Sequence, residues 1–148
     1  MLLWLLFHSI HASFLHITDI HVDPSYVPGA QLENGCHYLS EPSLQNPPAG
    51  KYGAPLSSCD SPLSLVNETF GFIFSHLEPL DFVIWTGDNA RHDTDVKMPR
   101  TMDEIKKLNI LIRDYMLQFK NIPVLPSIGT ASLIFNLKEI MIFIRIIL

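Results

Sequence analysis

Acidic and imidazole side chains occur at two places in the sequence that are typical of strand ends. Asp19 and His21 are two positions apart at the end of an alternating, β-rich segment, so both side chains would point the same way. Asp88 follows an apolar run and a glycine. Carboxylate oxygens and imidazole nitrogens bind divalent cations. If both strands belong to the same sheet, the pattern predicts a metal site formed by Asp19, His21 and Asp88. The alternative is a surface pair, because an Asp-x-His pair alone is also common on protein surfaces.

The chemistry of such a site favours phosphoester or phosphoanhydride hydrolysis. An Asp shared by two cations holds them roughly 3.5–4 Å apart, a spacing at which water attacks phosphorus in line. His92 lies four residues after Asp88 and is a candidate proton donor to the leaving oxygen, with a solvated loop histidine as the alternative. Arg91, Lys97 and Arg100 follow the proposed metal edge, where they would bind a polyanionic substrate or form a solvated helix start.

Three strands must deliver these side chains. The segments 14–20, 81–86 and 121–126 are rich in apolar and β-branched residues. The middle one is apolar throughout, as expected for a central parallel strand. With the helices between them, the order is β-loop-α-β-α-β, which predicts a single α/β domain with a layered sheet.

Two helices are predicted between the strands. Ser61 as N-cap and Pro62 as the first helical residue indicate a helix over 62–77. Thr101 and Glu104 match a capping box, and apolar residues at helical spacing predict a second helix over 101–119.

The segment 22–61 is a long predicted loop that needs a stabilising cross-link. Cys36 and Cys59 are the only cysteines, and a pair across such a loop suggests a disulfide, with two buried free thiols as the alternative. A bridge that closes about 24 residues would contribute roughly 3 kcal/mol and implies an oxidising compartment. Asn67 is the acceptor of the only glycosylation sequon, which fits the secretory pathway.

Composition limits the classes of protein. The 148 residues are 47% hydrophobic and 17% charged, which fits one domain with a buried core. A net charge of −5 argues against nucleic acid as a partner. Nine of the 15 acidic residues and all seven histidines lie in residues 1–92, whereas eight of the 10 basic residues follow.

The two ends do not fit the domain. Residues 1–13 contain an apolar run that resembles a signal or anchor remnant, with a mis-started N-terminus as the alternative. Residues 130–148 form an apolar tail that is interrupted by charged residues and is too short to span a bilayer. We expect this tail to be foreign to the domain and the membrane to be contacted only through an N-terminal anchor.

Several separated motifs in residues 14–129 resemble, in order, the calcineurin-type metallophosphoesterases of the sphingomyelinase branch. Within that branch the sequence is most similar to fungal endopolyphosphatases. The motifs are His16-Ile-Thr-Asp-Ile-His21, Cys36-His37, Tyr52-Gly-Ala54, Cys59-Asp-Ser-Pro62, Ser64-Leu-Val-Asn67, Asp81-Phe-Val-Ile-Trp-Thr-Gly-Asp88, Ala90-Arg-His-Asp93 and Pro99-Arg-Thr101.

The resemblance implies a four-layer αββα sandwich and a vacuolar enzyme that cuts internal phosphoanhydride bonds of inorganic polyphosphate. Two divalent ions, such as Mn, Zn, Mg or Co, would carry the reaction. Asp19 and His21 would bind one ion, Asp88 would bridge both, and His92 would match the proton donor. The spacing of the two cysteines also matches a disulfide of the branch.

The sequence departs from this family pattern after the third strand. Ser127-Ile-Gly129 is followed by Thr130, where the family has an Asn ligand and then His or Asn, and no histidine follows His92. We therefore predict a partial domain, truncated after its first half, with an incomplete metal centre and no activity of its own. The alternatives are a sphingomyelinase-like phosphodiesterase and a non-catalytic fragment that binds metal or polyphosphate.

Overall fold

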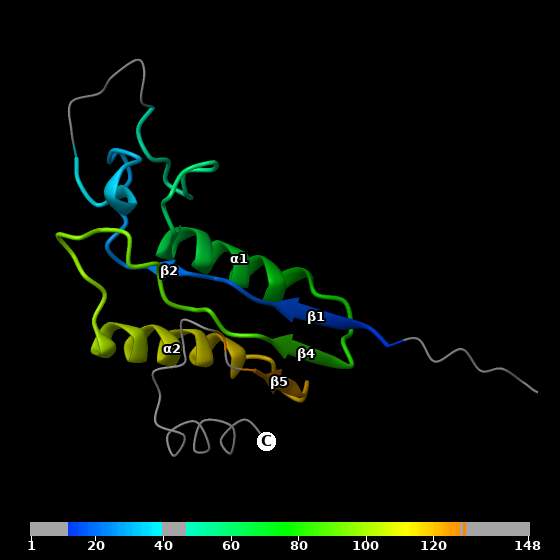
Figure 1. Cartoon of the computed structure of the whole chain (residues 1–148). Coiled ribbons are helices and arrows are strands. Elements are labelled where there is room, and N and C mark those ends of the chain that lie inside the picture. The colour runs from blue at the N-terminus through cyan, green and yellow to red at the C-terminus, as the bar shows by residue number, and fades with distance from the viewer. Residues whose placement is uncertain (1–11, 40–46, 128, 130–148) are drawn as a thin grey trace, which may run out of the picture.

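Figure 1 shows the computed structural model of the chain, in which residues 12–39, 47–127 and 129 are described. These residues form a mixed α/β structure, as predicted, with a three-stranded parallel sheet, a short pair of parallel strands and two α-helices. The main elements follow the predicted order, and two additional short strands lie inside or at the end of the predicted loop.

The main sheet consists of three strands in the order β1 (Phe14–Ile17), β4 (Phe82–Trp85) and β5 (Val124–Pro126). β4 is the central strand and pairs in parallel with both neighbours, so that Ile84 lies between His16 and Leu125. The apolar run therefore forms the predicted central strand. The carboxyl ends of β1 and β4 lie at one edge of the sheet, where the candidate ligands follow.

The helices α1 (Leu63–His76) and α2 (Met102–Met116) share one core with the sheet. Val83 and Trp85 of β4 are buried in this core. Phe70 of α1 stacks on Tyr115 of α2 at a ring distance of 4.3 Å, which joins the two helices. Burial of side chains of this size contributes about 1.5–3 kcal/mol each, so the core fixes the sheet edge that bears the site.

The start of α1 differs from the prediction. Pro62 is the N-cap and makes no side-chain capping bond. Ser61, the predicted cap, belongs instead to β3 (Ser61–Pro62), which pairs in parallel with β2 (Val22–Asp23). The backbone N–H of Ser61 donates to the carbonyl of His21 at 3.0 Å. This tertiary contact holds Ser61 in an extended strand and explains why the local capping signal was wrong.

Only half of the predicted capping box forms at α2. The backbone N–H of Glu104 donates to the Thr101 hydroxyl at 3.2 Å, so Thr101 is the N-cap. The Glu104 carboxylate, which a full box would return to the backbone of Thr101, accepts instead from Arg91 at 2.5 Å. A charged partner is the stronger one, because charge-assisted hydrogen bonds are about twice as strong as neutral ones.

The predicted loop is cross-linked as expected. Cys36 and Cys59 form a disulfide with a Cα–Cα distance of 5.5 Å, so the alternative of two free thiols does not hold. Tyr26 and Ala49 pack beside Cys36 in a second small core. A 3-10 turn, η1 (Asn34–Cys36), leads into the bridge. The described parts of the loop therefore pack together beside the site.

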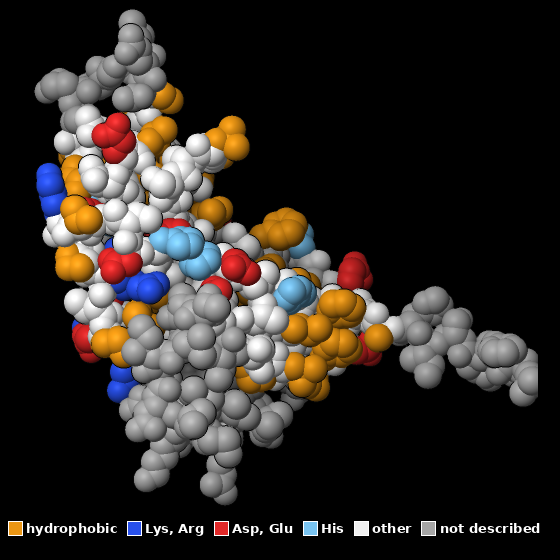
Figure 2. Space-filling model, viewed as in Figure 1, with side chains coloured by type: hydrophobic (Ala, Val, Ile, Leu, Met, Phe, Trp, Pro, Cys, Tyr) orange, Lys and Arg blue, Asp and Glu red, His pale blue; other side chains and the backbone are white. Residues whose placement is uncertain are grey.

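The face of the sheet opposite the helices carries apolar side chains at the surface (Figure 2). Phe14 stacks on Phe82 at 5.3 Å and is 52% exposed, and Leu125 is 46% exposed. Within the residues that the structure describes, no helix has the length and apolar character needed to cross a bilayer. The predictions for residues 1–11 and 130–148 lie outside the described residues.

Candidate metal centre

The two segments that carry the candidate ligands run side by side beyond the ends of β1 and β4. The backbone N–H of Asp19 donates to Gly87 at 3.2 Å, and that of His21 donates to Asp88 at 3.1 Å. β1 ends at Ile17 rather than at the predicted Ile20. The expectation that Asp19 and His21 lie on one side of a strand is therefore wrong. They come together because their backbone pairs with the loop that follows β4.

All three candidate ligands have left-handed backbone conformations. The φ angles of Asp19, His21 and Asp88 are 51°, 43° and 52°. Such a conformation costs an L-residue roughly 1–2 kcal/mol, and residues held in it cluster at functional sites. The fold thus maintains an unfavourable backbone at the three positions where the sequence predicts metal ligands.

The side chains of these residues form a group with the chemistry of a cation site. One ligand atom each of Asp19, His21 and Asp88 lies within 4.8 Å of the others. Nδ1 of His21 is 3.0 Å from the carbonyl of Ala90. Because a carbonyl only accepts, Nδ1 carries a hydrogen, so Nε2 is the nitrogen that the neutral ring offers to a metal ion, as in metal-binding histidines. Nε2 lies 3.5 Å from a carboxylate oxygen of Asp19.

The Asp19 carboxylate is held in its charged form. The hydroxyl of Thr18 donates to it, and this hydrogen bond lowers the pKa of Asp19. The desolvation of Asp19 acts in the opposite direction and is outweighed, while nearby His21 lowers the pKa further. An ionised carboxylate is the form that binds cations, so the donor set of two carboxylates and one imidazole fits a divalent metal ion.

The chain after β5 also reaches this edge. Gly129 lies against Asp88 so closely that a Cβ atom on it would be 2.3 Å from the backbone nitrogen and 2.4 Å from a carboxylate oxygen of Asp88. Contacts below 3.0 Å essentially do not occur for real Cβ atoms. A residue without a side chain is therefore required here for Asp88 to keep its position.

His92 lies next to the ligand group, together with an acidic residue that the motif reasoning did not assign to the site. The His92 ring stacks on that of His21 at 4.2 Å. Asp60 binds His92 through both carboxylate oxygens, at 2.7 Å from Nδ1 and 2.6 Å from the backbone nitrogen. His21, Asp60 and His92 also form a group whose ligand atoms lie within 4.8 Å. The sequence signal for Asp60 is its place in the motif Cys59-Asp-Ser-Pro62.

The three basic residues proposed to bind substrate have different surroundings. Arg91 is 1% exposed, and its guanidinium donates to Glu104 at 2.5 and 3.1 Å, so it is a buried structural cation. Lys97 is exposed, with Nζ 5.7 Å from the centre of the Tyr38 ring. Arg100 is half-buried and donates to the carbonyl of Arg91 at 2.6 Å, one residue before His92.

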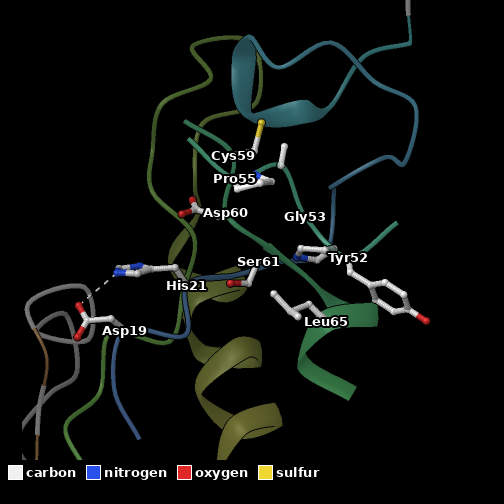
Figure 3. A pocket seen from close by; sticks show the side chains of 11 residues that line it. Asp19, His21, Tyr52, Gly53, Pro55, Cys59, Asp60, Ser61 and Leu65 are labelled. Atoms are coloured by element: carbon white, nitrogen blue, oxygen red, sulfur yellow. Dashed lines mark ion pairs between the residues drawn. The ribbon is translucent and has the colours of Figure 1, made fainter. Parts of the chain in front are cut away.

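A cavity of about 460 Å³ opens beside the ligand group. Asp19, His21 and Asp60 line one part of it, whereas Tyr52 and Leu65 line another (Figure 3). Among the described residues that line the cavity, none is a lysine or an arginine. The side of the site toward α1 is thus partly apolar. Figure 2 shows basic side chains beside the histidine and acidic group.

The predicted glycosylation residue lies away from this edge. Asn67 is exposed in the second turn of α1, and its side-chain oxygen accepts a hydrogen bond from the hydroxyl of Tyr115 in α2. Modification of Asn67 stays a prediction.

The carboxylates and imidazoles that follow β1 and β4 of the parallel sheet agree with the metal-site class that the motifs resemble. No protein-family model matches the sequence. The chain is 42% identical over 132 residues to endopolyphosphatase of Saccharomyces cerevisiae, and the match covers 81% of this chain and 19% of that protein. It is 39% identical to endopolyphosphatase of Neurospora crassa over 136 residues, 84% of this chain and 18% of that protein.

A third relative extends the similarity. Endopolyphosphatase of Schizosaccharomyces pombe is 36% identical over 127 residues, which are 78% of this chain and 22% of that protein. The chain spans about a fifth of the length of these relatives. We conclude that the chain is a relative of the endopolyphosphatases and is homologous to a segment of them, as the motifs predicted.

Proposed function

We propose that the chain is part of a metal-dependent hydrolase that cleaves internal phosphoanhydride bonds of inorganic polyphosphate. The single observation that carries this proposal is the convergence of Asp19, His21 and Asp88 within 4.8 Å at the carboxyl ends of β1 and β4. The similarity to proteins named endopolyphosphatase supports the choice of polyphosphate.

Each residue of the site has a role in this proposal. Asp19 and His21 would hold one divalent ion, and Asp88 would bridge to a second. Such ions supply Lewis acidity that neutralises charge on the phosphoryl group. His92, beside His21, would hold the proton for the leaving oxygen. Arg91 is buried, so substrate contacts in this proposal come from Lys97 and Arg100.

We propose that this chain alone binds one divalent ion weakly and does not turn over polyphosphate. Within the described part of the chain, the two candidate ligand groups share His21, so they cannot fill independently. Three ligands per ion are fewer than a stable site normally has.

Calorimetric titration with Mn²⁺ tests the metal site. We expect one binding event in the wild type, and loss of at least about tenfold in affinity in Asp88→Asn, which keeps the shape but removes the charge. Asp114→Asn, on the exposed end of α2, is the matched control and should bind like the wild type. Equal affinity in Asp88→Asn and the wild type would exclude this site.

A phosphodiesterase with an apolar leaving group is the second candidate. The cavity beside the site favours it, because Tyr52, Pro55 and Leu65 line it. Long-chain polyphosphate and a choline phosphodiester, offered as competitors for the Mn²⁺-loaded protein, would separate the two functions. Tighter binding of the diester than of polyphosphate would favour the phosphodiesterase function over polyphosphate hydrolysis.

Two wider features belong to the same proposal. The apolar face around Phe14, Phe82 and Leu125 supports a second sheet layer, as in a four-layer αββα sandwich. The disulfide of Cys36 and Cys59 supports an oxidising compartment and hence the secretory pathway and vacuole.

A further inference from the structure

The contact between Asp60 and His92 is more specific than a surface ion pair. One oxygen of Asp60 lies 2.7 Å from Nδ1 of His92, and the other accepts the backbone N–H of His92 at 2.6 Å. The side chain of Asp60 is 11% exposed, whereas the side chain of His92 is 58% exposed. An imidazole so exposed would otherwise sample several rotamers, and here both its ring and its backbone are tied to one carboxylate.

The contact also determines which ring nitrogen of His92 carries the hydrogen. An ionised carboxylate accepts hydrogen bonds and cannot donate them. Nδ1 therefore carries a hydrogen in the neutral ring as well as in the protonated one, and Nε2 is the nitrogen that can give up a proton. The stacking of the ring on His21 at 4.2 Å keeps it beside the ligand group.

Asp60 is itself fixed from both sides. The preceding residue, Cys59, is joined by the disulfide to Cys36, which is fully buried. The following residue, Ser61, donates its backbone N–H to the carbonyl of His21 at 3.0 Å. The disulfide loop and the ligand segment thus meet at Asp60.

We propose that Asp60 is the positioning residue of the proton donor His92 and that the Cys36–Cys59 disulfide holds Asp60 in place for this role. The proposal deepens the proposed function and rests on it for the role of His92. As water forms the new P–O bond and releases a proton to solvent, the bond to the leaving oxygen breaks. That oxygen takes the proton from Nε2 of His92, which becomes neutral imidazole with Nδ1–H still bonded to Asp60.

Nitrogen-15 NMR of the histidine rings in the labelled full chain reads the tautomer directly. In the neutral form of His92 we expect the Nδ1–H tautomer to exceed the Nε2–H tautomer by about tenfold, because its partner is charged. Asp60→Asn should invert this preference, since the amide can donate to Nδ1. Asp93→Asn removes a neighbouring charge without a contact to the ring and should leave the tautomer unchanged.

The wild-type spectrum alone keeps the proposal testable if Asp60→Asn does not fold. A wild-type His92 that is mainly Nε2–H would overturn the proposal. For the anchor, Cys36→Ser combined with Cys59→Ser should shift the His92 ring signals toward those of an unconstrained histidine. Unchanged His92 ring signals in this double variant would show that the disulfide does not hold Asp60 in place. The Mn²⁺ titration reports on the proposed function separately, because it depends on Asp19, His21 and Asp88 and not on the tautomer of His92.

Discussion

At the scale of single residues, the ligand positions combine unfavourable backbone with the chemistry of the site. Asp19, His21 and Asp88 all have positive φ angles, which glycine would adopt without steric strain. The pairing of this segment with residues 87–89 supplies the energy that keeps these residues in place. Stability and metal binding should therefore respond differently to substitution.

Asp19 provides a pair of variants that separates the two effects. Asp19→Gly relieves the backbone strain, whereas Asp19→Ala retains it, and both remove the carboxylate. We expect Asp19→Gly to have a free energy of unfolding about 1 kcal/mol above that of Asp19→Ala. Both variants should lose Mn²⁺ affinity equally. Urea titration and calorimetry measure the two quantities, and equal stabilities would contradict the strain argument.

Gly129 provides a steric test of the site. Gly129→Ala places a Cβ 2.3 Å from the backbone nitrogen of Asp88, which cannot move without moving the ligand. We expect Mn²⁺ affinity to fall at least about tenfold. Gly71→Ala is the control, because a Cβ there meets nothing within 4 Å and should stabilise α1 by about 1 kcal/mol. Normal Mn²⁺ affinity in Gly129→Ala would mean that Asp88 tolerates displacement.

At the scale of elements, a buried histidine joins the disulfide loop to the strands. Nδ1 of His37 is 2.8 Å from Asp95, and Nε2 is 2.8 Å from Asp23. Carboxylates only accept, so both ring nitrogens carry hydrogen and the ring is positively charged. Arg91, which is paired with Glu104, also lies 4.0 Å from Asp23. The residue after Cys36 thus connects three segments that surround the site.

The pH dependence of stability follows from this network. Burial opposes protonation of His37, but the hydrogen bonds to Asp95 and Asp23 outweigh it and raise its pKa above 6.5. The hydrogen bond from His37 lowers the pKa of Asp95 from 3.8 to about 2. The His37 contribution is therefore complete below pH 6.5 and is lost as pH rises through the raised pKa. The Asp95 contribution is complete above pH 3.8 and is lost toward pH 2.

We expect the melting temperature to be highest between about pH 4 and 6.5 and to fall on both sides. His37→Gln should remove the alkaline decline and lower the free energy of unfolding by roughly 3 kcal/mol, because two buried carboxylates lose a charged partner. His76→Gln, on the exposed side of α1, should keep the decline. Scanning calorimetry over this range checks the prediction, and an alkaline decline that persists in His37→Gln would assign it to another group.

Elements with strong local signals could be predicted from the sequence, whereas contacts between distant segments could not. The helices follow from apolar periodicity, which reflects burial of one face, and β4 follows from a continuous apolar run. The Asp60–His92 pair joins residues 32 positions apart, and the backbone bond between Ser61 and His21 also spans the loop. No local pattern encodes such pairings. The cysteine pair was predicted because its chemistry limits the possible partners.

At the scale of the whole molecule, the acidic and basic parts of the chain meet at the site. Asp19, His21 and Asp60 come from the acidic half, whereas His92 and Arg100 come from the segment where the basic residues begin. The parallel sheet brings the two together, since each helix returns the chain to the start of the next strand and all the strands end at the same edge. A polyanion approaching this edge would thus meet cation ligands and basic side chains together.

The apolar face of the sheet should govern how the molecule associates. Phe14 and Leu125 are 52% and 46% exposed there, and exposed apolar patches of this kind promote association. Leu125→Glu should raise the monomer fraction in sedimentation velocity severalfold and change the free energy of unfolding by less than about 0.5 kcal/mol, because the side chain is half solvated. Leu56→Glu, at a fully exposed loop position away from the strands, is the control and should leave association as in the wild type. If both variants associate like the wild type, the sheet face is not the surface responsible, and the proposal of a second layer over β1, β4 and β5 loses its support.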